Sequence, residues 1–318
     1  MLNFNIAVVF PGQGSQSVGM LQQYRDDWQQ VEQTFDQASL VLGYDLWDVV
    51  SNGPEEKLNL SFVAQPAMLA ADVAVIRIMS EQCMMKPYAL AGHSMGEYAA
   101  LVGANVLDFQ DAVGLVAARG RMMQDAVPQD QCAVAEVVGL YDELIIKYCT
   151  LASEESGEVV EVSCFNAPGE VVIAGHNIAV DRVIELVQEE ESLKRAVRLP
   201  DGVPEQCSLM KPMAEEFAAL LQQAEFNTPE LQVIHNVDAK SHDDVDSIRD
   251  ALVRQLYNPV RWTQIIQIIG EEADAIIECG PGKVLSALTR KINKEMHSYS
   301  LATPESMQRF LDSMSHDD

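Results

Sequence analysis

Residues 88–98, YALAGHSMGEY, contain the pattern that decides the fold. A short apolar run, Tyr88–Ala91, leads into Gly92-His93-Ser94-Met95-Gly96 and then into residues 97–106, which are predicted to be helical. The glycines and serine fit G-x-S-x-G, a sharp strand-to-helix turn that lifts a serine hydroxyl to the end of the strand. Backbone amides at the helix start favour negative charge there. An ordinary glycine-rich turn is the alternative, but the flanking strand and helix favour a nucleophile.

Apolar runs alternate with amphipathic stretches on both sides of this turn, which is typical of an α/β fold. Further strands are predicted where apolar runs precede turn residues, at Ile6–Phe10, Gln232–Ile234 and Ala275–Glu278. Helices are predicted over residues 64–79 and 108–125. We therefore expect a large domain built on a parallel sheet.

The middle of the chain has a different pattern. Strands are predicted at 133–139, 158–162, 171–175 and 195–199, and helices at 141–152 and 178–190. The order strand, helix, strand, strand, helix, strand is that of a ferredoxin-like unit. We expect a small ferredoxin-like subdomain at residues 130–200, inserted between the two pieces of the large domain, 1–129 and 201–318.

Composition excludes several classes of protein. The 318 residues include 21 Lys and Arg and 48 Asp and Glu, which gives a net charge of −27. Nucleic-acid binding and docking on an anionic membrane need clustered basic residues, so neither partner is expected. Because 48% of the chain is hydrophobic and 22% is charged, disorder is not expected either.

Targeting signals and metal-binding motifs are not recognised. The first ten residues lack the basic start of a secretory signal, and no window approaches the roughly 18 uninterrupted apolar residues of a membrane span. The six cysteines form no C-x-x-C pair, so no zinc site is predicted. We expect reduced thiols and a cytoplasmic protein.

A second glycine-rich loop follows the first predicted strand, at Phe10-Pro11-Gly12-Gln13-Gly14-Ser15-Gln16. A dinucleotide-binding G-x-G-x-x-G loop would need glycine at position 17, where Ser17 stands, and the Gly-Lys-Ser/Thr of a P-loop is missing. A plain turn remains one interpretation. The other is a loop whose backbone amides complete an oxyanion hole beside Ser94.

Taken together, these segments resemble the malonyl-CoA:acyl carrier protein transacylase family of fatty acid synthesis. The resemblance runs in order from about residue 4 to about residue 310. Several motifs in register are far more specific than any single one. The segments are Phe10–Gln16, GHSMGEY at 92–98, Arg119-Gly120, Met123-Gln124, RQLYNP at 254–259 and GPGKVL at 280–285. The resemblance implies an α/β-hydrolase-like core with an inserted ferredoxin-like subdomain.

The family's chemistry implies roles for individual residues. Ser94 matches the nucleophile that carries the acyl group as an ester between two thiols, in a ping-pong cycle. Gln13 and Met95 match the pair whose backbone amides hold the oxyanion. Arg119 matches the arginine that binds the malonyl carboxylate, for which a planar, always charged fork is suited.

Three further matches have alternatives that the residues themselves leave open. Met123 lies one helical turn beyond Arg119 and matches a pocket position, but plain core packing explains it too. Gln255 matches a residue whose backbone carbonyl orients the catalytic histidine. Asn166, in Phe165-Asn166-Ala167-Pro168-Gly169, resembles a substrate-side asparagine, and turn chemistry explains it equally well.

The sequence departs from the family at the general base. Where the family has a Val-Pro-Ser-His-like segment, this chain reads Val203-Pro204-Glu205-Gln206, so Gln206 occupies the histidine position. Glutamine cannot accept a proton at neutral pH, so it could only hold the hydroxyl by hydrogen bonds. Asp201 and Glu205 add negative charge beside a site for a carboxylate.

No other histidine is an obvious substitute. His93 adjoins Ser94, but adjacent side chains at such a turn point in different directions, so a structural or oxyanion-side role is expected. His235 follows a predicted strand near the site. It is either within reach of the serine or a hydrogen-bonded strand-end residue, and we expect the second. His176 lies at a turn of the small subdomain and is expected to be structural.

Two explanations of Gln206 compete. The chain is either a malonyltransferase slowed by loss of its base, or a relative with another task, such as acyl-thioester hydrolysis or non-catalytic binding of the carrier. Arg119 favours the first and Glu205 the second. We expect the first, an acyltransferase of reduced activity with malonyl-CoA and acyl carrier protein as partners and no cofactor or metal.

Docking of an acidic carrier would need local positive charge on this acidic chain. Two clusters are candidates, although basic residues on solvated helices are common and Glu189–Glu191 precede the first cluster. The clusters are Lys194, Arg195 and Arg198, and Lys283, Arg290, Lys291 and Lys294.

Overall fold

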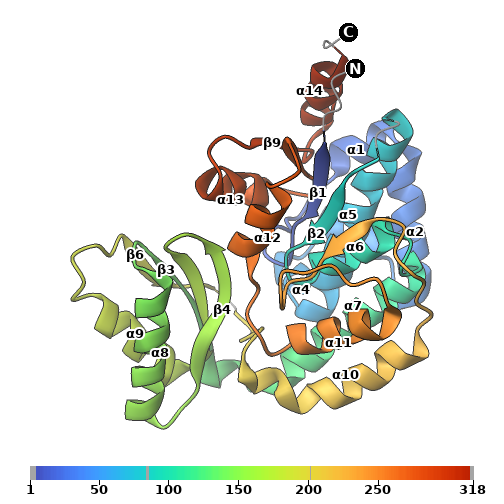
Figure 1. The fold of residues 1–318 in the computed structure, drawn as a ribbon. Helices are drawn as coiled ribbons and strands as arrows, with labels where there is room; N and C mark the ends of the chain where they lie inside the picture. The colour runs from blue at the N-terminus through green and yellow to red at the C-terminus, as the bar shows by residue number, and fades with distance from the viewer. Residues whose placement is uncertain (1–4, 84–85, 201, 316–318) are drawn as a thin grey trace.

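The protein is described here by a computed structural model of residues 5–83, 86–200 and 202–315. Within these ranges the chain forms two sheets, one parallel and one antiparallel, with helices packed on both (Figure 1). The predicted α/β fold with a parallel sheet and a small second sheet is confirmed.

The parallel sheet has the strand order β7-β2-β1-β8-β9. Its central strand pairs in parallel with both neighbours, so that Val8 lies opposite Leu90 on one side and Ile277 on the other. Four of its strands lie where the sequence predicts them, and the edge strand β9 was not predicted. The strands are β1 (Ile6–Phe10), β2 (Ala89–Gly92), β7 (Gln232–Ile234), β8 (Ala275–Glu278) and β9 (His297–Ser300).

Side chains alternate across the sheet and bury both faces, as expected for a parallel sheet. Val8 and Leu90 face the larger core and Ala7 and Ala91 the smaller one. The larger layer contains α1 (Gln22–Asp27), α2 (Gln29–Leu42), α3 (Leu46–Asn52), α4 (Glu55–Leu58), α5 (Ser61–Gln82), α6 (Gly96–Gly103), α7 (Phe109–Ala126), α10 (Lys211–Gln223), α11 (Val245–Gln255) and α14 (Pro304–Ser315). The smaller layer contains α12 (Trp262–Ile269) and α13 (Val284–Ile292).

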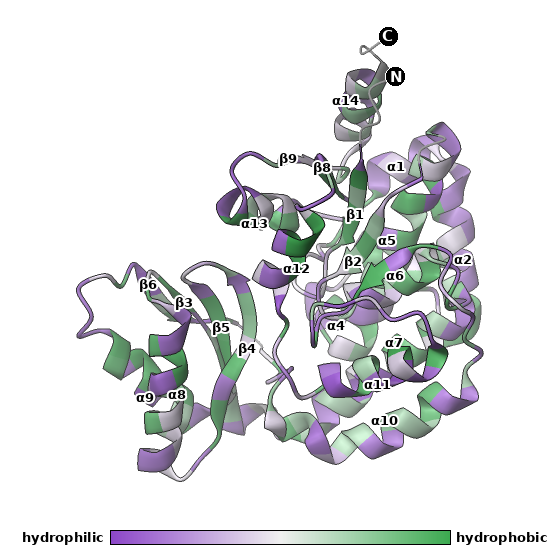
Figure 2. Cartoon of the chain, in the orientation of Figure 1, coloured by the Kyte–Doolittle hydropathy of each residue, from purple (hydrophilic) through white to green (hydrophobic). Residues whose placement is uncertain are grey.

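Helix α5 is apolar around its whole circumference because it is a central core helix. Its length and composition would suffice to cross a membrane, but 83% of its most apolar window is buried inside the fold. It packs against α2, α6 and α7. Figure 2 shows the same concentration of hydrophobic residues along β1 and α5.

The second sheet is antiparallel, with the strand order β4-β5-β3-β6. Numbered by their sequence within this segment, the strands run 2-3-1-4, which is the ferredoxin-like arrangement. Two helices pack with it around a core of its own. The elements are β3 (Cys132–Val138), α8 (Asp142–Ser156), β4 (Val160–Ala167), β5 (Glu170–His176), α9 (Asn177–Val187) and β6 (Arg195–Arg198), preceded by the 3-10 turn η1 (Gln129–Gln131).

Strand β4 connects the two sheets. The amide of Phe165 donates to Val260 O at 2.9 Å, and the amide of Val260 donates to Ser163 O at 2.9 Å, just ahead of α12. This pairing fixes the end of β4 beside the carboxyl edge of the parallel sheet. Ser163 and Asn166 are therefore placed close to the turn that follows β2.

Candidate active site

The loops that follow three adjacent parallel strands meet at the carboxyl edge of the sheet. Gln13 follows β1, Ser94 follows β2 and Asn236 follows β7. Because the strands are parallel and neighbouring, their carboxyl ends lie at one edge, which is where α/β sheets bind ligands. The backbone amide of Ser94 donates to Asn236 Oδ1 at 2.7 Å, which joins two of these loops directly.

The turn at Ser94 has the strain and close packing that G-x-S-x-G requires. Ser94 has φ of 52°, in the left-handed region that non-glycine residues rarely adopt. A Cβ on Gly92 would lie 1.9 Å from Gly96 C, and a Cβ on Gly96 would lie 2.4 Å from Phe10 O. Glycine is thus the only residue that fits at either position without moving the backbone.

The hydroxyl of Ser94 is surrounded by three polar side chains. Gln206 Nε2 donates to Ser94 Oγ at 2.7 Å, and Arg119 Nη2 donates to it at 3.2 Å. Glu205 Oε2 lies 3.4 Å from the same oxygen. The serine is 7% exposed, so it lies almost completely buried at the carboxyl edge of the sheet.

Arg119, on α7, is completely buried and held in a fixed orientation. Its Nη1 donates to Gln65 Oε1 at 2.9 Å and its Nη2 to Gln255 Oε1 at 3.0 Å. Its Nε has no hydrogen-bond partner within the described part of the chain. Apart from Glu205, whose Oε2 lies 4.0 Å from Nη1, the partners of this guanidinium are neutral groups, so it can still bind an anionic ligand.

Gln65, on α5, contacts several residues around Arg119. Its Nε2 lies 3.3 Å from Gln13 Oε1, 3.4 Å from Glu205 Oε1 and 3.8 Å from Met123 Sδ. Met123 is buried in the same core as α5. The sulfur of Met123 therefore lies within this group of polar side chains, although its remaining contacts are apolar.

Gln255 reaches the site through its side chain. Its Nε2 donates to Ser94 O at 3.2 Å and to Glu97 Oε2 at 2.8 Å, and its Oε1 accepts from Arg119. The resemblance implied a role for its backbone carbonyl beside the residue at position 206. Instead, the hydrogen bonds of the Gln206 side chain within the described ranges are to Ser94, Glu205 and Ser163.

A buried layer beneath the nucleophile was missed by sequence reasoning. Glu97, fully buried, accepts from the amide of Asn236 at 2.9 Å and contacts His235 Nδ1 at 2.7 Å. Asn236 Nδ2 in turn donates to Gly92 O at 2.6 Å. The sequence contained one usable signal for this layer: a polar His-Asn pair directly after a predicted strand.

The segment that carries Gln206 also has unusual backbone geometry. Gln206 has φ of 54°, so two non-glycine residues in left-handed conformations face each other across the site. Ser163 Oγ donates to Glu205 O at 2.9 Å and lies 3.4 Å from Gln206 Oε1. The 3-10 turn η2 (Ser208–Met210) follows at once. Asp201, whose charge was expected to bear on the site, lies outside the described residues.

The histidines near the site are engaged elsewhere. His93 Nε2 lies 2.9 Å from Asn166 Oδ1, and its ring packs against Trp262, so it points away from the Ser94 hydroxyl. Burial lowers the pKa of His93, only partly offset by its hydrogen bond with Asn166, so the ring is neutral at pH 7. His235 is fully buried on Glu97, as expected of a strand-end histidine. His176 contacts the amide of Val159 inside the small sheet unit, as a structural residue does.

The amides expected to form an oxyanion hole are oriented by the two loops. Gly96, Glu97 and Tyr98 donate their amides to the carbonyls three residues earlier, at the start of α6. In contrast, neither Gln13 N nor Met95 N has a backbone acceptor within the described ranges. Amides without a backbone acceptor on the loops after β1 and β2 are available to stabilise a developing oxyanion.

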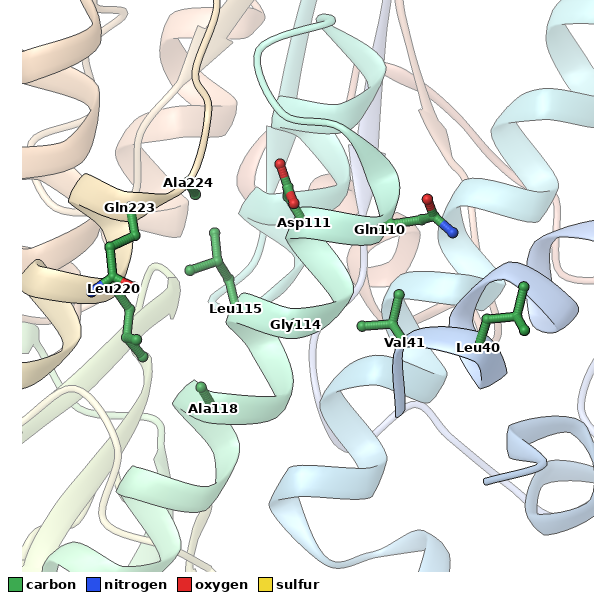
Figure 3. Close-up of a pocket in the computed structure, with 10 residues that line it drawn as sticks. All are labelled: Leu40, Val41, Gln110, Asp111, Gly114, Leu115, Ala118, Leu220, Gln223 and Ala224. Carbon is green, nitrogen blue, oxygen red and sulfur yellow. The ribbon is translucent and has the colours of Figure 1, made fainter. Parts of the chain in front are cut away.

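Other surface features lie apart from this site. In the two basic clusters, Arg198 pairs with Asp181 and Lys291 with Glu170, while Lys283 and Arg290 are exposed. Figure 3 shows a surface hollow between α2, α7 and α10. Its lining shares no residue with the surroundings of Ser94, so it has no part in the chemistry described here.

A strained serine at a strand–helix turn opposite a buried arginine defines an acyl-transferring α/β protein. The family model described as "Acyl transferase domain" matches residues 7–315. The chain is 49% identical to the malonyl CoA-acyl carrier protein transacylase of Haemophilus influenzae over 93% of this chain and 94% of that protein.

Solved structures agree with this assignment. The malonyl CoA-acyl carrier protein transacylase of Coxiella burnetii superimposes with a TM-score of 0.95 at 40% identity, covering 98% of each chain. A malonyl-transacylase solved in complex with a type II PKS acyl-carrier protein gives 0.94 at 44% identity, covering 97% of this chain and 99% of that one. The chain belongs to the malonyl CoA-acyl carrier protein transacylase family.

Proposed function

We propose that this protein transfers a malonyl group from malonyl-CoA to acyl carrier protein through an ester on Ser94. One observation carries the proposal: Ser94 Oγ, on its strained turn, lies 3.2 Å from a nitrogen of the buried Arg119. A nucleophile and a fixed cation at this distance fit an acyl group that ends in a carboxylate.

The cycle has two acyl transfers, first from a thioester to Ser94 and then from the Ser94 ester to a second thiol. Ser94 Oγ attacks the malonyl thioester, and coenzyme A leaves as the free thiol. The thiol of the carrier then attacks the Ser94 ester and takes the malonyl group. In each step the amides of Gln13 and Met95 stabilise the tetrahedral oxyanion, and the loss of one such donor typically raises the barrier by about 2.7–4 kcal/mol.

Arg119 binds the malonyl carboxylate during both steps. Its amide partners, Gln65 and Gln255, hold the guanidinium without neutralising it. Met123 closes the apolar side of the pocket. Asn166 acts from the substrate side by holding the neutral ring of His93. Gln206 stands where the family has its base, and there it holds the hydroxyl of Ser94 without taking its proton.

Several wider features belong to the same proposal. Residues 130–200 act as the inserted unit, and 1–129 with 201–318 form the core. The cluster of Lys283, Arg290, Lys291 and Lys294 supplies positive charge for the carrier on an otherwise acidic chain. The reaction uses no cofactor beyond the coenzyme A thioester that is its substrate, and takes place in the cytoplasm.

The test is the intact mass of the full chain after mixing with malonyl-CoA. The protein should gain the mass of one malonyl group, and Ser94→Ala should gain none. Addition of holo acyl carrier protein should then move the group to the carrier. Release of free malonate instead would identify a hydrolase, and the absence of any adduct would leave a non-catalytic binder.

A further inference from the structure

We propose that Glu205 is the general base for Ser94, in place of the histidine that the family uses. This inference rests on the proposed function, because it assigns the proton of the same serine. The observation behind it is the position of the Glu205 carboxylate, whose Oε2 lies 3.4 Å from Ser94 Oγ. That separation is longer than the usual O–H···O hydrogen bond, and catalytic hydrogen bonds tighten as the substrate binds.

The hydrogen bonds around the hydroxyl identify Glu205 as the proton acceptor. A serine hydroxyl has one hydrogen to donate and two lone pairs to accept with. Gln206 Nε2 and Arg119 Nη2 are donors only, and they occupy both lone pairs. The hydrogen of Ser94 must therefore point to an acceptor, and Glu205 Oε2 is the acceptor at hydrogen-bonding distance.

The carboxylate also decides which way the Gln206 amide faces. Gln206 Nε2 contacts both Ser94 Oγ at 2.7 Å and Glu205 Oε2 at 3.2 Å. Rotating the amide by 180° would place its oxygen against the carboxylate oxygen, which is repulsive. Gln206 thus serves as a donor that lies between the nucleophile and the carboxylate and fixes their geometry.

Besides its contact with Gln206, Glu205 is held by residues of two further elements. Ser163 of β4 donates to its backbone carbonyl at 2.9 Å, and Gln65 of α5 lies 3.4 Å from its Oε1. Its side chain is 14% exposed, so it is shielded without being sealed from solvent. A base needs this placement, because its rotamer must be fixed and its proton must be able to leave.

The charged and titratable groups that face Glu205 are few. Arg119 Nη1 of α7 lies 4.0 Å from Glu205 Oε2 and is the positive charge beside this carboxylate. Cys164 of β4 faces it as well, and burial, together with the nearby Glu205, raises the pKa of that thiol to about 12. Cys164 therefore stays neutral and does not compete for the proton.

The step balances as follows. As Ser94 Oγ bonds to the thioester carbon, its proton passes to Glu205 Oε2 and the carbonyl electrons move to the oxyanion. When the oxyanion collapses, the C–S bond breaks and the proton passes from Glu205 to the departing sulfur of coenzyme A. In the second half-reaction the thiol proton of the carrier passes to Glu205 as the carrier sulfur bonds to the ester carbon, and it then passes to Ser94 Oγ as the C–O bond breaks.

A competing role for Glu205 is to occupy Arg119 in place of the malonyl carboxylate. Both roles use the same carboxylate, but they predict opposite effects when it is removed. Loss of a base slows ester formation with every acyl-CoA. Loss of a competing anion speeds ester formation with malonyl-CoA and leaves acetyl-CoA unaffected.

The experiment measures the rate of Ser94 ester formation on the full chain, by quenched mixing with malonyl-CoA or acetyl-CoA followed by intact mass. Glu205→Gln should slow it by about 10²–10⁴-fold with both substrates. Glu205→Asp should retain at least about tenfold more activity than Glu205→Gln, because it keeps a carboxylate. Glu215→Gln, at an exposed glutamate on α10, is the matched control and should leave the rate unchanged.

The pH profile separates a base from a merely structural residue. Between about pH 6 and 8, the rate of Glu205→Gln should rise more steeply with pH than the rate of the native chain, because hydroxide must replace the lost base. The double variant Glu205→Ser with Gln206→His should lose activity below about pH 6.5.

Two results would overturn the assignment of Glu205. One is a Glu205→Gln rate within about twofold of the native rate with both substrates. The other is a faster rate with malonyl-CoA alone, which would make Glu205 a competing anion. If neither the native chain nor the Gln206→His double variant forms an ester, the proposed function itself fails. Circular dichroism and Tm of each variant must match the native chain for these rates to be compared.

Discussion

The two sides of the active site contain the same backbone feature, fixed in different ways. On one side Ser94 adopts a left-handed conformation with φ of 52°, and on the other Gln206 does so with φ of 54°. Ser94 is held by backbone packing, because Gly92 and Gly96 admit no side chain. Gln206 is held by hydrogen bonds between side chains, chiefly with Ser94 and Glu205.

This difference indicates which side of the site tolerates amino-acid substitution. At Gly92 and Gly96 any Cβ would lie about 2 Å from a neighbouring backbone atom, so only glycine fits. The nucleophile turn is therefore recognisable in the sequence. Side-chain hydrogen bonds can be rebuilt with other donors and acceptors at modest cost. The pair Glu205-Gln206 is an example, because both residues contact the hydroxyl of Ser94 where the family has one histidine.

The largest effect is expected from Gly96→Ala, which tests the side held by packing. The added Cβ would lie 2.4 Å from Phe10 O, so the turn must shift and carry Ser94 with it. We expect ester formation to fall more than about 10²-fold and the free energy of unfolding to fall by about 1–3 kcal/mol. Intact mass and urea denaturation measure the two effects.

Its control is Gly114→Ala on α7, where the nearest atom to an added Cβ is Val41 Cγ1 at 3.9 Å. Alanine should raise stability there by about 0.5–1 kcal/mol, because glycine is unfavourable inside a helix. Equal losses in the two variants would contradict the claim that the nucleophile turn is uniquely constrained.

Helix α5, which packs beneath the nucleophile side, contains a buried carboxyl group, Asp72, that lowers stability when it is ionised. Its two carboxylate oxygens have no hydrogen-bond partner within the described residues, and a Cβ on Gly280 would lie 2.1 Å from its Oδ1. Burial, with a smaller effect of Glu278, raises the pKa of Asp72 well above its usual value. The stabilising protonated form is therefore present at low pH and is lost as the pH rises through the raised pKa.

Asp72→Asn should remove this pH dependence. The variant should become more stable relative to the native chain as the pH rises. The difference in free energy of unfolding, variant minus native chain, should be about 1–3 kcal/mol larger at pH 8 than at pH 5. Urea denaturation at the two pH values measures it, with Asp125→Asn, at an exposed position on α7, as the control. A constant difference between native chain and variant at both pH values would refute the buried, protonated state of Asp72.

The smallest effect is expected from Ser163→Ala, on the side held by hydrogen bonds. The variant loses the bond from Ser163 Oγ to Glu205 O, which is worth about 0.5–1.5 kcal/mol. Ester formation should slow by about two- to tenfold. Ser80→Ala, which removes a hydroxyl bonded within α5 at Ile76 O, should not change the rate. A loss as large as that of Gly96→Ala would mean that both sides are equally rigid.

Much of the fold could be predicted because its signals are local. The strands before Gln13, Ser94 and His235 are short apolar runs that end in turn residues, and each lies within a residue or so of its predicted position. The edge strand β9 (His297–Ser300) was not predicted, since its pattern HSYS is half-exposed and weakly apolar. The helix around Pro66 begins three residues earlier than its apolar run indicated.

The candidate site could be predicted only in part. Ser94 stands out because of its motif, and Arg119 because it matches the carboxylate-binding arginine of the family. Gln65 and Glu97 carry no such mark: each is a polar residue inside an apolar helix, and its partners are 54 and 138 positions away in sequence. The side-chain role of Gln255 was missed for the same reason.

The sequence by itself determined the strand-to-helix turn at Ser94 and the positions along the chain of the strands β1, β2, β7 and β8. Both follow from glycine sterics and apolar periodicity, which act between neighbouring residues. Only the tertiary structure decided that Glu205 points at the serine hydroxyl while His93 and His235 point elsewhere. Side-chain direction depends on the partners that distant segments supply, and β4 with α5 supplies them to Glu205. No pattern along the chain predicts the contacts of Glu205 with Ser163 and Gln65.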